Sequence, residues 1–250
     1  MIKKILHAPY LPETDSTIRY MREEVPENNY FMTIVRAGFQ TAGRGQGTNT
    51  WESERDKNIL CSIRVHPQGL PANRQFVLLQ AVALAIKDTL DRYTDGITIK
   101  WPNDIYWNDR KISGTLTECT VSRGLVTGCI IGIGVNINQQ VFTGGAPNPI
   151  SLCTITGRQE DVIGINGEIA QRIGHYLCKY IDKGTYRHIY ELYLHSLYRR
   201  DGLHPYRDTQ GTFRAAIEGI EPDGHLVLRR ADGTLSRYAF KEVEFILSEE

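Results

Sequence analysis

The apolar run from Leu125 to Asn138 is the feature that most constrains how this chain can fold. It reads LVTGCIIGIGVNIN, a nearly continuous series of β-branched and small residues without a charge. A strand of this composition is typical of the middle of a sheet, where other parts of the protein cover both faces. Gly132-Ile133-Gly134 does not indicate a dinucleotide-binding loop, because the third glycine is missing and no helical pattern follows. We therefore expect a layered fold with this run as a central strand.

The segments around this run alternate between strand-like and helix-like patterns. Short apolar runs indicate strands, and longer stretches with apolar residues three and four positions apart indicate helices. The stretch from Asn73 to Tyr93 has the length and spacing of a long buried helix, and we expect it to be scaffold. The predicted fold class is α+β, with a mixed sheet and helices. We expect strands at residues 2–7, 31–37, 59–65 and 97–101 and further helices at about 17–24, 165–183 and 185–200.

The character of the chain changes near its C-terminus. From about Tyr206 it consists of short alternating strands, broken by the turn signals Pro222-Asp223-Gly224 and Ala231-Asp232-Gly233. This pattern predicts a small β-barrel. We therefore expect two domains, residues 1–203 and residues 204–250.

Charge and cysteine content narrow the class of protein. With 29 basic and 29 acidic residues the net charge is zero, which argues against a nucleic-acid partner, since such proteins usually carry a basic excess. No signal peptide or membrane span is visible, because His7 and Pro9 interrupt the first apolar run, so we expect a cytoplasmic protein without a membrane partner. The five cysteines include no CxxC pair and are expected to be buried thiols.

A glycine-rich segment, Gln40 to Ser53, reads QTAGRGQGTNTWES. Glycines at 43, 45 and 47 allow positive φ, which would turn successive backbone N–H groups toward one anion. Arg44 adds a guanidinium, whose planar fork matches a phosphate or a carboxylate. A connection this long without its own structure is usually functional or disordered, and we expect it to be mobile when empty and to close over a ligand. The segment therefore predicts an anion site under a lid.

A second polar segment, Lys100 to Glu118, reads KWPNDIYWNDRKISGTLTE. It predicts a hairpin in which residues 105–107 pair with residues 111–116 across a turn at 108–110. By alternation, Ile112, Gly114 and Leu116 should share one face, and Lys111 should begin the other. Together the two segments predict a site that activates a carboxylic acid with a nucleotide. No GxSxG pattern or convincing Cys/His arrangement indicates a covalent nucleophile.

These motifs resemble those of the biotin protein ligases, also called biotin-acetyl-CoA-carboxylase ligases. That family has a GRGRxxRxW loop, KWPNDI followed by (D/G)RKxxGILxE, and a GIGxNxN strand. Here they stand as GRGQGTNTW at 43–51, KWPNDIYWNDRKISGTLTE at 100–118 and GIGVNIN at 132–138, with DST at 15–17 and Gln40 also fitting. The resemblance extends from about residue 6 to the C-terminus. It implies a catalytic domain of the class II synthetase-like biotin ligase fold, followed by an SH3-like C-terminal domain.

The resemblance also implies an activity in two steps. Biotin carboxylate attacks the α-phosphate of ATP to give biotinyl-5′-AMP and pyrophosphate, and the biotinyl group then passes to a lysine of a biotin carboxyl carrier domain of a carboxylase. Mg²⁺ would neutralise the leaving pyrophosphate, and its ligands are not identified by the sequence. Some relatives carry an N-terminal DNA-binding module. Here the first strand-like run leads almost directly into the motifs, so we expect the monofunctional type. The exposed strand edge near the site is a candidate for pairing with a second copy in a homodimer or with the acceptor.

The resemblance implies a role for each motif residue. Arg44 and Lys111 would supply positive charge to the reacting groups, and Asp104 would orient the acceptor ammonium and help remove its proton. Ser16 and Thr17 would bind the ureido group of biotin, beside Ile18, where the family has Asn. Gln40 would bind biotin, and Asn136 would meet the nucleotide. The full set of expected binding residues is Ser16, Thr17, Ile18, Gln40, Gly43, Arg44, Gly45, Gln46, Trp51, Lys111, Gly114 and Asn136.

Several of these residues also have plain structural interpretations. Trp51 either packs against adenine or anchors the loop, and Asp104 either acts on the acceptor or bonds its own backbone in a turn. Residues 15–17 either bind biotin or only cap a helix. Lys100 and Glu118 are explained almost as well by an exposed cross-strand ion pair as by a role in the site.

The chain departs from the family pattern at two loop positions, where Gln46 and Asn49 replace arginines. Both positions lose a permanent charge, which predicts a weaker hold on the intermediate and easier release. Two other functions remain to be separated from biotin ligation. One is a lipoate or octanoate ligase or transferase of related fold. The other is a non-catalytic binding module with a vestigial nucleotide site.

Overall fold

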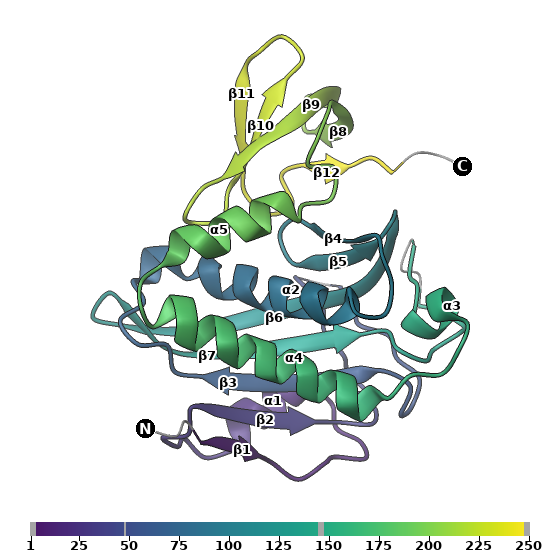
Figure 1. Cartoon of the computed structure of the whole chain (residues 1–250), viewed down its shortest axis with the longest axis vertical. Coiled ribbons are helices and arrows are strands. Elements are labelled where there is room, and N and C mark those ends of the chain that lie inside the picture. Colours follow the sequence, from purple (N-terminus) through teal and green to yellow (C-terminus); the bar gives the residue numbers. More distant parts are fainter. Residues whose placement is uncertain (1–3, 48, 145–147, 248–250) are drawn as a thin grey trace.

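The computed structural model describes residues 4–47, 49–144 and 148–247. Its larger part is a seven-stranded sheet with the strand order β1-β2-β3-β7-β6-β5-β4 (Figure 1). β1 pairs with β2 in parallel and all other neighbours are antiparallel, so the sheet is mixed, as expected. The strands are β1 (Ile5–His7), β2 (Met32–Arg36), β3 (Ile59–Val65), β4 (Ile97–Lys100), β5 (Asp104–Trp107), β6 (Arg110–Ser122) and β7 (Leu125–Val135).

Helices cover both faces of this sheet. Helices α2 and α4 lie across one face, and α1 lies on the other (Figure 1). The long helix expected at 73–93 is confirmed as α2, although its regular part begins only after a 3₁₀ turn. α4 begins before the expected residue 165, because the Asp161 carboxylate accepts a hydrogen bond from the Ile163 N–H and caps it. The helices are α1 (Thr17–Glu23), η1 (Ala72–Arg74), α2 (Phe76–Leu90), α3 (Leu152–Thr156), α4 (Val162–Tyr176), the π-helical η2 (Leu177–Ile181) and α5 (Tyr186–His195).

β7 is confirmed as a central strand, with β3 on one side and β6 on the other. Ile131, Ile133 and Val135 are buried in the hydrophobic core that the helices share. Because side chains alternate along a strand, Gly132 and Gly134 are on the opposite face. The middle of the sheet therefore carries a strip of bare backbone on the α1 side.

A β-bulge in the β5/β6 hairpin decides which way the Lys111 side chain points. The ladder register shifts between Ile105 and Tyr106, so that Ile112 has no direct partner on β5. Lys111 and Gly114 consequently lie on the same face, and a Cβ atom on Gly114 would be 3.3 Å from Lys111 Nζ. Ile112 is instead buried in the core. The predicted pairing is confirmed, but the predicted sharing of a face by Ile112 and Gly114 is wrong, because strict alternation assumes an uninterrupted ladder.

The C-terminal residues form a second, five-stranded antiparallel sheet with the order β11-β10-β9-β8-β12, at the top of Figure 1. Both predicted turns are confirmed: the Gly224 N–H donates to the carbonyl of Glu221 (2.8 Å), and the Gly233 N–H to that of Arg230 (2.9 Å). The fold class, a mixed-sheet α+β part followed by a small β part, is therefore as expected. The strands are β8 (His204–Asp208), β9 (Gly211–Ile220), β10 (Leu226–Arg230), β11 (Leu235–Tyr238) and β12 (Glu244–Phe245).

An aromatic junction joins the second sheet to the rest of the chain. The centroid of the Phe240 ring lies 5.2 Å from that of Trp101 and 6.0 Å from that of Phe76. Trp101 Nε1 also donates to the carbonyl of Gly224 (2.9 Å). Trp101 is only 4% exposed. This residue of the KWPND motif is therefore buried where the second sheet packs against the first part of the chain.

All five cysteines are free thiols. Cys61, Cys129 and Cys153 are buried, as expected, and Cys119 and Cys178 are half-buried. Among the described residues, no helix is both long and apolar enough to span a bilayer.

Candidate functional site

A pocket of about 730 Å³ opens where the glycine-rich loop meets the first sheet. This volume is typical of sites for small molecules and cofactors. The walls come from the start of α1, the loop, the neighbouring parts of β4 to β7, and a turn of the second sheet. Gly43 is the only residue of the expected site that does not line the pocket. The residues brought together are Ser16, Thr17, Ile18, Gln40, Arg44, Gly45, Gln46, Trp51, Asp104, Lys111, Gly114 and Asn136.

The glycine-rich loop is folded onto itself rather than arranged as a nest. The Trp51 N–H donates to the Gly43 carbonyl (3.0 Å), and the Gly45 N–H donates to the Asn49 carbonyl (2.8 Å). Of the three loop glycines only Gly47 has a positive φ (68°). The Gly45 N–H is already used for a hydrogen bond within the loop. The expected convergence of N–H groups on one anion is therefore absent from the described part of the loop.

Glu52 fastens the end of this loop to a neighbouring segment. Its carboxylate accepts hydrogen bonds from the Thr143 N–H (2.8 Å), the Thr143 hydroxyl (2.9 Å) and the Gly144 N–H (2.6 Å). Burial acts to raise the pKa of Glu52, but these donors outweigh it, and the pKa is lowered. The charged form of Glu52 therefore holds the loop over the pocket.

Two side chains lie directly on the bare backbone of β7. A Cβ atom on Gly132 would be 2.4 Å from Ile18 Cδ1, and one on Gly134 would be 2.4 Å from Trp51 Cε2. No side chain other than hydrogen fits at either position without displacing a neighbour. The two glycines thus form the pocket floor. The sequence pattern does not show this role, because glycines also occur in ordinary buried strands.

The start of α1 is held by a network of hydroxyl and amide groups. Gln40 Oε1 accepts from the Thr17 N–H (2.8 Å) and from the Thr17 hydroxyl (3.0 Å). The Ser62 hydroxyl donates to Thr17 Oγ1 (2.9 Å), so that oxygen has both a donor and an acceptor. Ser16 caps the helix by accepting from the Arg19 N–H, which leaves its own hydroxyl proton available. The capping interpretation of Ser16 is confirmed, and its role toward biotin stays a prediction.

Lys111 and Asp104 form an ion pair inside the pocket. Lys111 Nζ lies 2.7 Å from Asp104 Oδ1, and both side chains are less than one-third exposed. The Lys111 backbone is fixed as well, since its N–H donates to the Asn148 carbonyl (2.8 Å) and its carbonyl accepts from the Ile150 N–H (2.9 Å). The Asp104 carboxylate therefore pairs with Lys111 rather than bonding to the backbone of a local turn.

Lys100 also belongs to the pocket, and the ion pair suggested for it with Glu118 does not exist. β5 separates β4 from β6, so the two residues are not neighbours; Glu118 instead pairs with Arg22 (2.8 Å). Lys100 Nζ lies 5.2 Å from the Tyr106 ring centroid and 5.4 Å from that of Phe245. Burial lowers the pKa of Lys100, and the charge of nearby Asp104 opposes this shift. The pocket thus contains a desolvated cation for which a surface ion pair was, from the sequence, almost as good an explanation.

Three buried polar atoms of residues that line the pocket have no partner among the described residues, and Thr115 Oγ1 is one of them. Asn136 Nδ2 donates to the Ile150 carbonyl (3.1 Å), whereas Asn136 Oδ1 has no donor. Trp51 Nε1 likewise has no acceptor. Buried polar groups are normally satisfied, so an acceptor and a donor left open in a pocket suit a polar ligand.

The second sheet supplies a wall that sequence reasoning missed. Lys241, Val243, Glu244 and Phe245 all line the pocket. They lie in a segment with no motif of its own, far in sequence from the other walls, and only the folded arrangement brings them there. Ser62 was missed for a different reason, since a serine in a buried strand gives no signal of its partner.

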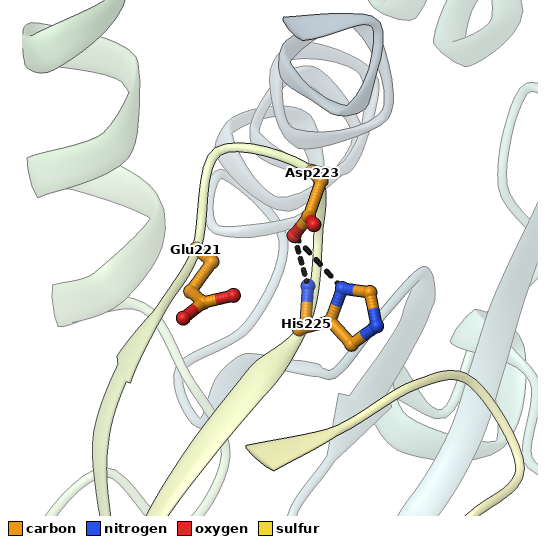
Figure 2. A group of neighbouring side chains, drawn as sticks. All are labelled: Glu221, Asp223 and His225. Atoms are coloured by element: carbon orange, nitrogen blue, oxygen red, sulfur yellow. Dashed lines mark hydrogen bonds and ion pairs between the residues drawn. The ribbon is translucent and has the colours of Figure 1, made fainter. Parts of the chain in front are cut away.

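Outside the pocket, Glu221, Asp223 and His225 present their ligand-type atoms within 4.8 Å of one another (Figure 2). Asp223 Oδ1 accepts from the His225 N–H (3.2 Å) and contacts His225 Nδ1 (2.8 Å). The Arg237 guanidinium pairs with both Glu221 and Asp223, so a side-chain cation already occupies the centre of charge. We assign no metal to this cluster.

Comparison with known proteins gives consistent matches. The signature of the Biotin/lipoate A/B protein ligase family matches residues 10–136. The bifunctional ligase/repressor BirA of Bacillus subtilis is 32% identical over 93% of this chain and 72% of its own length. The biotin--[acetyl-CoA-carboxylase] ligase of Paracoccus denitrificans is 34% identical over 51% of this chain and 55% of its own length.

Solved structures agree with the sequence matches on the fold. The biotin protein ligase of Aquifex aeolicus, in complex with biotin and ATP, superimposes with a TM-score of 0.77 at 23% identity and covers 99% of this chain and 100% of that chain. The biotin protein ligase of Leishmania major in complex with biotin gives a TM-score of 0.64 at 25% identity, covering 94% of this chain and 98% of that chain.

Proposed function

The chain belongs to the Biotin/lipoate A/B protein ligase family, and from that premise we propose that it is an ATP-dependent biotin protein ligase. It activates biotin to biotinyl-5′-AMP, releases pyrophosphate and transfers the biotinyl group to a lysine of a biotin carboxyl carrier domain. One observation supports this most directly. A hydroxyl and amide cluster, a bare apolar floor and a lysine follow one another along β7 and its neighbour β6: Ile18 lies on Gly132, Trp51 on Gly134, and Lys111 on Gly114, the partner of Gly134.

The hydroxyl end of the pocket suits the cyclic urea of biotin. A urea needs both donors and acceptors, and the Ser16 hydroxyl retains a free proton beside Thr17. Ile18 and the Gly132 backbone offer an apolar surface for the fused rings. Gln40 contributes by holding Thr17 in place.

Activation requires two anions to approach each other, the biotin carboxylate and the α-phosphate of ATP. Lys111 supplies a preorganised positive charge at that point, fixed by Asp104 and by its backbone contacts. Arg44, which is exposed and has no carboxylate partner among the described residues, provides a second positive charge from the loop. Lys100 adds a desolvated cation to the same pocket.

The nucleotide base is assigned to the side of the pocket where polar atoms are open. Asn136 Oδ1 would accept from the adenine amino group, and the Trp51 indole would pack against the base. In the transfer step, Asp104 orients the acceptor ammonium beside Lys111 and takes up its proton.

Magnesium enters with the nucleotide rather than through a protein site. Each carboxylate that lines the pocket is already engaged: Asp104 with Lys111, Glu244 with Arg207 (3.2 Å), and Glu52 with residues 143 and 144. Mg²⁺ usually keeps several waters and binds substrate phosphates. Among the described residues the pocket has no free carboxylate pair for the ion, and we assign it no protein ligand.

The same proposal places the protein in the cytoplasm, where five free thiols stay reduced. Its acceptor is the carrier domain of a biotin-dependent carboxylase, and neither a nucleic-acid nor a membrane partner is required. A homodimer formed through an exposed strand edge of the first sheet is compatible with this activity.

The test is biotin-dependent exchange of labelled pyrophosphate into ATP, run in parallel with lipoate and octanoate. Exchange with biotin alone is expected, because lipoate and octanoate have no urea group that could bond to the hydroxyl and amide cluster of the pocket. Exchange with lipoate instead would keep the fold and overturn the substrate. No exchange with any acid would favour a non-catalytic binding module.

A further inference from the structure

One cation of the pocket is not used by the chemistry described above. Lys241, in the turn between β11 and β12, lines the pocket from the second sheet. Its ammonium reaches the glycine-rich loop, since a Cβ atom on Gly47 would be 2.3 Å from Lys241 Nζ. Gly47 has no side chain and a φ of 68°, so its backbone leaves room for the ammonium.

The turn that carries Lys241 is fixed in place. The Glu242 N–H donates to the Ala239 carbonyl (3.2 Å), and the Ala239 N–H donates to the Glu242 carboxylate (2.7 Å). The adjacent residue Phe240 packs on Trp101 and Phe76. Lys241 itself has a φ of 70°, a strained conformation for a residue with a side chain, and such strain clusters at functional sites.

The charge of Lys241 is not neutralised by the protein. No ion pair joins it to a carboxylate within the described ranges 4–47, 49–144 and 148–247, and the two acidic residues that follow it are engaged elsewhere. Glu242 closes the turn and Glu244 pairs with Arg207. An exposed, preorganised ammonium at the mouth of an anion-binding pocket is suited to bind a phosphate as a point charge.

We propose that Lys241 binds the β- and γ-phosphates of ATP, and hence the leaving pyrophosphate. This rests on the proposed ATP-dependent ligation. Lys111 lies on the sheet beside Gly114, at the proposed meeting point of the carboxylate and the α-phosphate, whereas Lys241 lies next to Gly47 of the glycine-rich loop. With the α-phosphate at Lys111, the β- and γ-phosphates would reach Lys241, which lines the same pocket from the second sheet. Because Gln46 and Asn49 are uncharged, Lys241 supplies from the second sheet a positive charge that the loop lacks at those two positions.

The test measures steady-state pyrophosphate exchange for wild type, Lys241→Ala and Lys241→Arg, with Lys183→Ala as a control. Lys183 is an exposed lysine in a turn outside the pocket. Lys241→Ala is expected to raise the KM for ATP and for pyrophosphate about tenfold, an effect of the size of one charge-assisted contact, while the KM for biotin changes less than about twofold. For Lys241→Arg both KM values should stay within about threefold of wild type, and Lys183→Ala should have the wild-type values.

Unchanged KM values for ATP and pyrophosphate in Lys241→Ala would overturn the proposal. Equal rises in the KM for biotin and for ATP would also overturn it, because that result indicates a disturbed pocket rather than a lost phosphate contact. Unchanged exchange kinetics, together with a raised KM for the carrier domain in the complete transfer reaction, would overturn the proposal and assign Lys241 to the acceptor instead. Absence of exchange activity in the wild-type protein would overturn the proposed function rather than the assignment of Lys241. Salt provides a second readout, since the ATP KM of Lys241→Ala should depend less on ionic strength than that of wild type.

Discussion

Lys111 and Asp104 meet across the β5/β6 hairpin with 2.7 Å between ammonium and carboxylate, and the bulge at Ile112 is what turns Lys111 toward its partner. Both groups are partly shielded from solvent, which strengthens the interaction relative to an open surface pair. The ion pair therefore holds two charged groups side by side in the pocket, one for each half of the proposed reaction. Lys111 would act on the acid and the α-phosphate, and Asp104 on the incoming amine.

Replacing Lys111 by alanine is expected to slow biotin-dependent pyrophosphate exchange on the order of a hundredfold to a thousandfold, because one preorganised charge at the reacting groups is lost. Exchange kinetics of the folded variant measure this directly, with Lys183→Ala as the matched lysine control. A Lys111→Ala protein that exchanges within about tenfold of wild type, hence within ~1.4 kcal/mol, would remove Lys111 from the site.

Alanine substitutions along β7 should separate the two halves of the pocket. Gly132→Ala places a methyl group on Ile18 and should raise the KM for biotin about tenfold, whereas Gly134→Ala displaces Trp51 and should act mainly on the KM for ATP. Gly128→Ala is the control on the same strand, since its Cβ would meet nothing closer than 3.6 Å. Equal effects of the two pocket variants on both substrates would contradict this division.

The uncharged loop residue Gln46 predicts easy release of biotinyl-AMP. Gln46→Arg restores a charge beside Arg44 and should slow dissociation of the intermediate by about three- to tenfold, as expected for one added ionic hydrogen bond. The off-rate can be followed by rapid gel filtration of enzyme loaded with labelled biotin. An unchanged off-rate would show that the missing charge at this position does not govern release.

The hydrogen bonds of Glu52 predict an acid-sensitive loop. Its pKa in the folded protein is lowered from the ordinary value of 4.5, so the stabilisation is fully present above about pH 4.5 and is lost as the pH falls through the folded-state pKa. Hydrogen exchange of the loop in wild type and Glu52→Gln is the measurement. Wild type should be better protected near neutral pH, and the two proteins should converge in acid; a difference that persists there would rule out this carboxylate as the cause.

Local patterns predicted much of the fold. The apolar run that became β7, the hairpin around Lys111 and the two C-terminal turns are each specified by residues close together in sequence. The β-bulge was not predicted, because an unpaired Ile112 differs from a paired one only in the register of its neighbours.

The motif residues of the site were predicted and, apart from Gly43, gather around one pocket. What they contact was not predicted. The burial of Lys100, the arrangement of Gln40 around Thr17, and the approach of Lys241 to Gly47 depend on segments distant in sequence, and no local pattern encodes them. The expected nest failed for the same reason, since the choice between binding an anion and folding back on Asn49 is made by the whole loop.

The aromatic junction at Phe240 has a practical consequence for protein engineering. The pocket has walls from both sides of the linker at residues 201–203, and Trp101 is covered only when the second sheet is docked. A chain cut in that linker would therefore yield two fragments, neither of which holds a complete pocket. Their reassembly would switch on biotin transfer, which makes this linker the natural cut site for a split enzyme that reports on the proximity of two fused proteins.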